Sequence, residues 1–169
     1  MVGPAHEELE QGLTRVMNAA SITNLQRLSG GASRETWRFT ADDEEFVLQR
    51  VRPGAIGGFQ VEPRVLSAVH RAGVPVAELV VDGAERTELQ SPFMIVRAVE
   101  GETIARKILR DDRFNAARTV LTSQLGVAAA HLHQIDTSSI PGLVADDQMN
   151  RYQTVLRDLG EPHPVFEAA

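Results

Sequence analysis

The spacing of apolar residues changes near Gly101, and this change constrains the fold more than any other feature of the sequence. Before it, short apolar and β-branched runs bounded by turn residues predict strands. After it, apolar residues recur three and four positions apart, which is the period of an amphipathic helix. We therefore predict an α+β chain with an N-terminal unit over residues 1–97 and a helical unit over residues 98–169.

The N-terminal unit is predicted to contain an antiparallel sheet of about five strands. Residues 6–19 show the spacing of an opening helix, and residues 61–73 that of a second, shorter one. The strand patterns fall within residues 22–28, 35–40, 46–51, 74–85 and 91–101. Glycine and acidic turns join the first three strands, so we expect two successive hairpins.

The helical unit is dominated by one long periodic segment. An apolar face predicts a helix from about residue 115 to residue 136; its residues are Leu121, Leu125, Ala128, Leu132 and Ile135. A further helix is predicted near residues 149–159, and Pro164 suits the first turn of another. A helix of one turn has most of its apolar face still to come, so we interpret the sequence as a fragment with exposed apolar faces that favour self-association.

The composition argues against several kinds of partner and of metal site. The formal net charge of -6 opposes general binding to nucleic acid or to an anionic membrane. The sequence contains no apolar run of the length that spans a bilayer. It contains no cysteine, so disulfides and thiolate metal sites are excluded, and the cytoplasm is the expected location.

Two glycines form the turn between the first two predicted strands. The turn residues are Gly30, Gly31, Ala32 and Ser33. Backbone N–H groups in such a turn can approach phosphate oxygens, and the Ser33 hydroxyl adds a donor. The turn matches neither of the two common glycine-rich phosphate motifs, and it does not open a helix. An ordinary hairpin turn is the alternative.

The third predicted strand ends in Gln49 and Arg50, whose side chains must point to opposite faces of the sheet. One of them faces the groove below the glycine turn, and the sequence does not decide which. An arginine there would bind phosphate if a carboxylate held it in place. Glu62 is the candidate carboxylate because it lies in line with an apolar helix face. The alternatives are a solvated charge for Arg50 and, because Pro63 follows, a capping role for Glu62.

The segment from Phe93 to Gly101 connects the last predicted strand to the helices. Its backbone N–H and C=O groups are partly without sheet partners, so they could bind a flat heterocycle. A plain connector between the two units is the alternative interpretation.

Five segments, taken in order, resemble the aminoglycoside phosphotransferase family, which shares the protein-kinase-like fold. They look like its nucleotide loop, third strand, Glu-bearing helix, hinge and first large helix; the segments are LSGGASRETWRF, FVLQRVRPG, VEPRVLSAVHRAGVPVAELV, FMIVRAVEG and LGVAAAHLHQID. The resemblance is greatest to bacterial phosphotransferases related to the kinase domains fused to acyl-CoA dehydrogenases. It implies a kinase-like N-lobe followed by the first helices of a C-lobe.

The resemblance also implies roles for individual residues. Glu62 would orient the basic residue of the third strand, while the backbone of Arg97 and Val99 would bind adenine with Val96 behind it. The turn would lie over the phosphates of ATP; its residues are Gly30, Gly31, Ala32 and Ser33. The sequence departs from the family at Gln49, where many members have Lys or Arg, and its own basic residue, Arg50, comes one place later.

A second departure concerns catalysis. The family's H-G-D-x-x-x-x-N-like catalytic loop and later metal-binding Asp do not occur before Ala169. We therefore expect that the parent protein transfers the γ-phosphoryl group of ATP to a hydroxyl of a small molecule, with Mg²⁺ ligands beyond residue 169. Residues 1–169 would contain no catalytic residue or metal ligand and would be inactive alone. The alternatives are a non-catalytic kinase-like module that binds nucleotide or protein, and an unrelated α+β binding domain.

Overall fold

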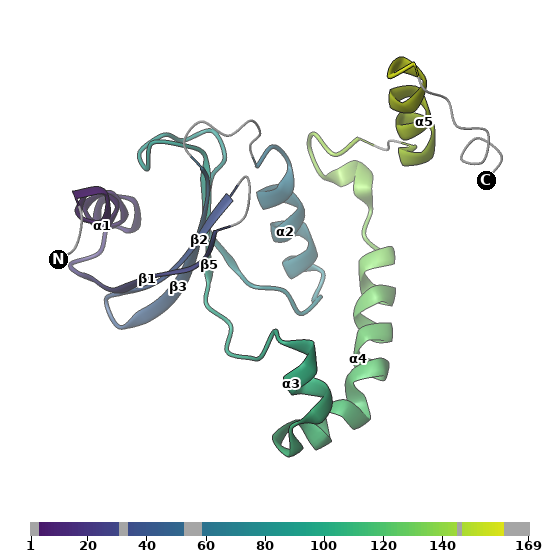
Figure 1. Ribbon diagram of the computed structural model, residues 1–169, viewed down its shortest axis with the longest axis horizontal. Helices are drawn as coiled ribbons and strands as arrows, with labels where there is room; N and C mark the ends of the chain where they lie inside the picture. The colour runs from purple at the N-terminus through teal and green to yellow at the C-terminus, as the bar shows by residue number, and fades with distance from the viewer. Residues whose placement is uncertain (1–3, 31–33, 53–58, 145–146, 161–169) are drawn as a thin grey trace.

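The computed structural model describes residues 4–30, 34–52, 59–144 and 147–160, and Figure 1 shows its arrangement. One antiparallel sheet with the strand order β1-β2-β3-β5-β4 forms its N-terminal part. The strands are β1 (Ile22–Gly30), β2 (Arg34–Ala41), β3 (Glu44–Val51), β4 (Leu79–Gly83) and β5 (Phe93–Arg97). The helices are α1 (Pro4–Met17), α2 (Glu62–Arg71), α3 (Ala105–Arg110), α4 (Asn115–His133) and α5 (Gln148–Asp158), with 3-10 turns η1 (Asp112–Phe114) and η2 (Thr137–Ser139). The predicted α+β class and five-stranded antiparallel sheet are confirmed.

The hairpin between β2 and β3 turns on two acidic residues. Asp42 and Asp43 have φ values of 45° and 73°, the left-handed pair that a tight two-residue hairpin requires. The Asp42 carboxylate accepts hydrogen bonds from the amides of Ala20 (3.0 Å) and Ser21 (2.9 Å). This turn therefore also fixes the connection that leads from α1 into β1.

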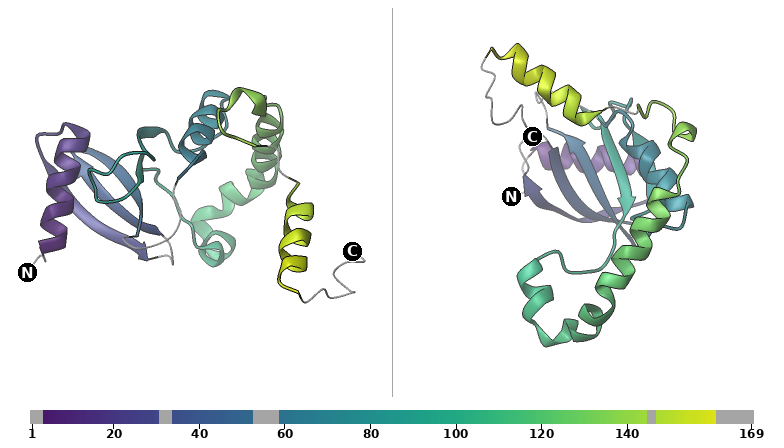
Figure 2. Two further views of the ribbon diagram at one scale, coloured as in Figure 1. Left: turned by 90° about the horizontal axis from the view of Figure 1, so that it is seen from above. Right: turned by 90° about the vertical axis from the view of Figure 1, so that its right-hand side faces the viewer.

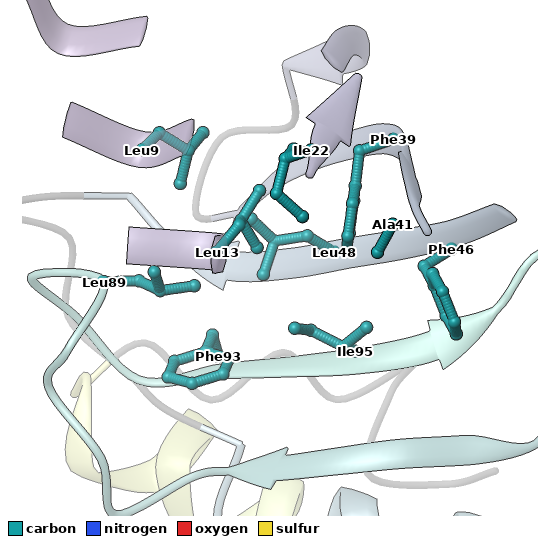
Figure 3. Close-up of a cluster of buried hydrophobic side chains, with 10 residues drawn as sticks. All are labelled: Leu9, Leu13, Ile22, Phe39, Ala41, Phe46, Leu48, Leu89, Phe93 and Ile95. Atoms are coloured by element: carbon teal, nitrogen blue, oxygen red, sulfur yellow. The ribbon is translucent and has the colours of Figure 1, made fainter. Parts of the chain in front are cut away.

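Helix α1 covers one face of the sheet, and the main core lies beneath it (Figures 1 and 3). Leu13 of α1 is fully buried against the sheet. Gly12 permits close approach, because a Cβ atom there would lie 2.6 Å from the Leu89 side chain. The buried cluster consists of Leu9, Leu13, Ile22, Phe39, Ala41, Phe46, Leu48, Leu89, Phe93 and Ile95.

Helix α2 lies on the opposite face of the sheet (Figures 1 and 2). The buried cluster on this face is smaller and consists of Val51, Phe59 and Met94. The helix begins at Glu62 and ends at Arg71, after which Gly73 adopts a φ of 77°. Such a left-handed residue after a helix is a common stop signal, so the predicted end of this helix is confirmed.

The helical segment after β5 rests on α2. Residues 98–104 have no regular secondary structure, and α4 then runs past α2 on the side away from the sheet (Figures 1 and 2). The contact with α2 is made beyond α4, where Ile140 is buried and Arg64 Nη1 donates to the Pro141 carbonyl at 3.3 Å. Helix α4 itself buries none of its residues, although its predicted span is nearly correct.

The last predicted helix, near Pro164, lies outside the described residues. Within the described ranges, every helix is too short or too polar to cross a membrane.

Candidate functional site

The two residues at the end of β3 lie on different faces of the sheet. Arg50 pairs in register with Phe93, which belongs to the core under α1. Gln49 pairs with Met94, which belongs to the cluster on the α2 side. Since paired residues of neighbouring strands share a face, Arg50 is on the α1 face and Gln49 is on the α2 face.

Arg50 is occupied by a structural ion pair on the α1 face. Its Nε lies 3.0 Å from Oε2 of Glu35, and its Nη1 donates to the Leu89 carbonyl at 3.3 Å. Both side chains are nearly buried, with 12% and 11% exposed for Arg50 and Glu35. Trp37 Nε1 donates to the same carboxylate oxygen at 3.0 Å. This ion pair therefore holds the hairpin of β2 and β3 against the loop before β5.

The pKa of Glu35 reflects this environment. Burial by itself raises the pKa, but the hydrogen bonds from Trp37 and Arg50 and the charges of Arg50 and Arg27 lower it more strongly. The result is a pKa below the ordinary value of 4.5, so the carboxylate is ionised at neutral pH.

Glu62 is also paired, but with an arginine that the sequence interpretation did not consider. Its carboxylate meets the guanidinium of Arg34 through two contacts, Nη2 to Oε2 at 2.7 Å and Nη1 to Oε1 at 3.0 Å. The guanidinium also lies 4.3 Å from the ring centre of Phe59. The expected pairing of Glu62 with the basic residue of β3 is wrong, because Arg50 points to the other face. The alternative capping role for Glu62 is not observed: the helix cap is Val61, without a side-chain hydrogen bond.

Two of the predicted residues, Gln49 and Val96, share the α2 face with Arg34. Arg34 pairs in register with Val51, and Val96 pairs with Val47, which alternates with Gln49 on the same side of β3. The row extends from the end of the β1–β2 hairpin to the end of β5. The four-residue step from Val47 to Val51 along β3 corresponds to about 13 Å at the usual rise of a strand.

The hairpin end of this row is described only in part. Gly30 is the last residue of β1 and pairs with Glu35 of β2. The remaining residues predicted for the turn, Gly31, Ala32 and Ser33, lie outside the described residues. Arg34 follows them directly, so its position at the start of β2 also marks the edge of the turn.

The other end of the row is the exit from β5. The Arg97 amide donates to the Glu78 carbonyl and the Ala98 amide to the Glu45 carbonyl, both at 2.9 Å. The Arg97 guanidinium lies 2.9 Å from Glu44 and 3.1 Å from Glu78. Val99 is 71% exposed, and within the described part of the chain its amide donates to no backbone carbonyl. The connector thus presents backbone groups from a firmly held strand end.

Among the described residues, no three His, Cys, Asp or Glu side chains gather closely enough to hold a metal ion. His131 and His133 belong to α4 and are two residues apart, so they point in different directions. The arrangement therefore offers a charged hairpin end and a polar connector, without a metal site in the described ranges.

The sheet order, the glutamate-bearing helix on one face and the connector into helices are together typical of the N-terminal lobe of the protein-kinase-like fold. The structure is similar to that of a Ralstonia eutropha protein described as a candidate aminoglycoside phosphotransferase, with a TM-score of 0.66 and 23% identity over 93% of this chain and 48% of that one. The sequence profile of the phosphotransferase enzyme family, APH, matches residues 24–161. The chain belongs to this family.

Two further solved structures show the same fold. Aminoglycoside phosphotransferase APH(4)-Ia has a TM-score of 0.63 at 18% identity, covering 91% of this chain and 51% of that one. A thermostable mutant of APH(4)-Ia, solved as a ternary complex with AMP-PNP and hygromycin B, has a TM-score of 0.53 at 22% identity, covering 78% and 40%. The chain spans about half the length of the first two structures. No curated protein sequence matches it.

Proposed function

We propose that this chain forms the nucleotide-binding part of a phosphotransferase that transfers a phosphoryl group from ATP to a hydroxyl of a small molecule. The observation that carries the proposal is the Glu62–Arg34 pair on the face shared by Gln49 and Val96. It places a fixed charge beside the hairpin, in a chain whose family is that of phosphotransferases.

In this proposal, ATP lies along the α2 face of the sheet. The hairpin covers the phosphates with Gly30, Gly31, Ala32 and Ser33. At the other end, the Arg97 carbonyl and the Val99 amide bind adenine, with the Val96 side chain behind the base. Gln49 faces the bound nucleotide. Arg50 stabilises the lobe from the opposite face and has no contact with ATP.

The remaining chemistry is assigned to chain beyond residue 169. Phosphoryl transfer needs a carboxylate that positions the acceptor hydroxyl and Mg²⁺ that neutralises the phosphates. Neither the catalytic loop nor the metal-binding Asp occurs in this sequence. We therefore propose a nucleotide-binding lobe over residues 1–97, the start of the helical lobe over residues 98–169, a cytoplasmic parent enzyme and no kinase activity for this chain alone.

Nucleotide binding is tested by thermal unfolding of the chain in Mg²⁺ with and without ATP. A ligand that binds only the folded state raises the melting temperature. We expect a rise for the wild-type chain and a smaller one for Glu62→Ala. The Arg86→Gln variant, which removes an exposed charge paired with Glu88, is the control and should match the wild type. No rise at any ATP concentration would refute the proposal.

Catalysis is tested separately by ATP turnover. The purified chain of residues 1–169 should show none above background, whereas the longest protein encoded by its gene should phosphorylate some hydroxyl acceptor. Hygromycin B is a reasonable first acceptor, since a structural neighbour was solved with it. Turnover by the chain alone would refute the proposal that the catalytic groups lie beyond residue 169.

A second candidate function is a kinase-like module that binds nucleotide or protein without catalysis. The neutral Gln49 favours it, because many members of the family have Lys or Arg there. The coding sequence past Ala169 distinguishes the two: an H-G-D-type loop and a later Asp indicate an enzyme, and their absence indicates the module.

A further inference from the structure

We propose that Arg34, from the second strand, is the cation that contacts the nucleotide phosphates, and that Glu62 is the residue that positions it. This inference rests on the proposed function and names a residue that the sequence interpretation did not consider. A positive charge supplied by the neighbouring strand would explain why the neutral Gln49 can stand on β3.

The first argument is the absence of a cation on β3. The residues of β3 that alternate onto the α2 face are Glu45, Val47, Gln49 and Val51, and none of them carries a positive charge. Arg50 is turned to the α1 face and is nearly buried against Glu35. Polyphosphate is bound most strongly by charge-assisted hydrogen bonds, so the cation must come from another element.

The second argument is the position of Arg34. It begins β2 directly after the turn proposed to cover the phosphates. Arg38 shares its face by alternation, but it lies four residues further along β2 and is paired with Glu45 and Glu100 near the connector. Of these two arginines, Arg34 is the one at the phosphate end.

The third argument is the way in which Arg34 is held. The two-point contact with Glu62 fixes the plane of the guanidinium, and the Phe59 ring lies against it at 4.3 Å. Its side chain is nevertheless 36% exposed, so a ligand can reach it. A guanidinium fixed in this way loses little conformational freedom when it binds phosphate.

The experiment measures the affinities of ATP and adenosine by calorimetry, with Mg²⁺ present throughout. For Arg34→Gln we expect ATP affinity to fall at least about tenfold, which corresponds to the loss of one charge-assisted hydrogen bond, while adenosine affinity stays unchanged. The R34Q/Q49K double variant returns a cation to the same face and should recover most of the ATP affinity. The Arg86→Gln variant matches the change in charge and should bind both ligands as the wild type does.

The outcomes separate this inference from the proposed function. If the wild type binds neither ligand, both are overturned. If it binds ATP and Arg34→Gln binds ATP equally well, or loses ATP and adenosine alike, only the role of Arg34 is overturned. Melting without ligand checks folding, and if Arg34→Gln does not fold, Arg34→Lys decides: the inference requires a lower affinity for ATP and an unchanged affinity for adenosine.

Discussion

The two faces of the sheet each carry an arginine–glutamate pair, and the pairs differ in their surroundings. On the α1 face, Arg50 and Glu35 are 12% and 11% exposed and lie beside the main core. On the α2 face, Arg34 and Glu62 are 36% and 43% exposed and lie at the edge of a small cluster. The same chemical pair can therefore serve to stabilise the lobe on one face and to remain accessible to a ligand on the other.

The burial of neighbouring residues on β3 differs between the two faces in the same way. Leu48 is fully buried under α1, whereas its neighbour Gln49 faces the α2 side and is only partly buried. A sheet stabilised mainly from one side can leave polar groups on the other without losing its fold, since most of the hydrophobic stabilisation comes from the covered side. The predictions below test this division, beginning with the largest effect.

Leu48→Ala should reduce the free energy of unfolding by about 3 kcal/mol, since it removes a fully buried side chain from the main core. The control is Gln49→Ala on the other face, which should cost less than about 1 kcal/mol. Urea unfolding of both variants without nucleotide measures the difference. Equal losses would show that the two faces contribute alike.

Arg50→Met should cost about 2 kcal/mol, because it leaves the nearly buried Glu35 without its cation. Glu62→Gln changes the exposed pair and should cost under about 1 kcal/mol. The two substitutions should have the reverse order of effect on nucleotide binding, because only Glu62→Gln should lower the affinity for ATP. The distinction between the two pairs would be wrong if Arg50→Met lowered the affinity for ATP while the melting curve of the variant stayed unchanged.

The stability of the chain should depend on pH in acid because the pKa of Glu35 is lowered in the folded state. Its pKa lies below 4.5 in the folded chain, so its contribution is complete above the unfolded value and is lost as the pH falls through the folded value. The difference in unfolding free energy between the wild type and Glu35→Gln should therefore be constant near neutral pH and shrink in acid. Urea unfolding at several pH values measures it, and a difference that grows in acid would contradict the assignment.

Asp43→Gly should stabilise the chain by about 0.5 kcal/mol, because Asp43 has a φ of 73° that glycine adopts without strain. Thr40→Gly, inside β2, should have the opposite sign. Since the turn belongs to neither face, ATP binding should not change. Thermal melting of both variants, without and with ATP, measures stability and binding together.

The sequence predicted the elements better than the contacts between them. Alternation places Gln49 and Arg50 on opposite faces, but the choice between the faces depends on Met94 and Phe93, more than forty residues away. Arg34 carried a usable signal, because it is two residues before Thr36, which pairs with Gln49 and so shares its face. The periodicity of α4 gave its span but not its burial, since the face that it presents has no described partner.

Among the described residues, the helical segment is attached to the sheet unit through the connector after β5 and through the contact of Arg64, near the start of α2, with Pro141. A body attached at two separated points can rock about the line that joins them but cannot swing freely. Any such rocking would pull on the first turn of α2, where Glu62 lies two residues before Arg64. Closure of the two units around a ligand would therefore displace this carboxylate directly.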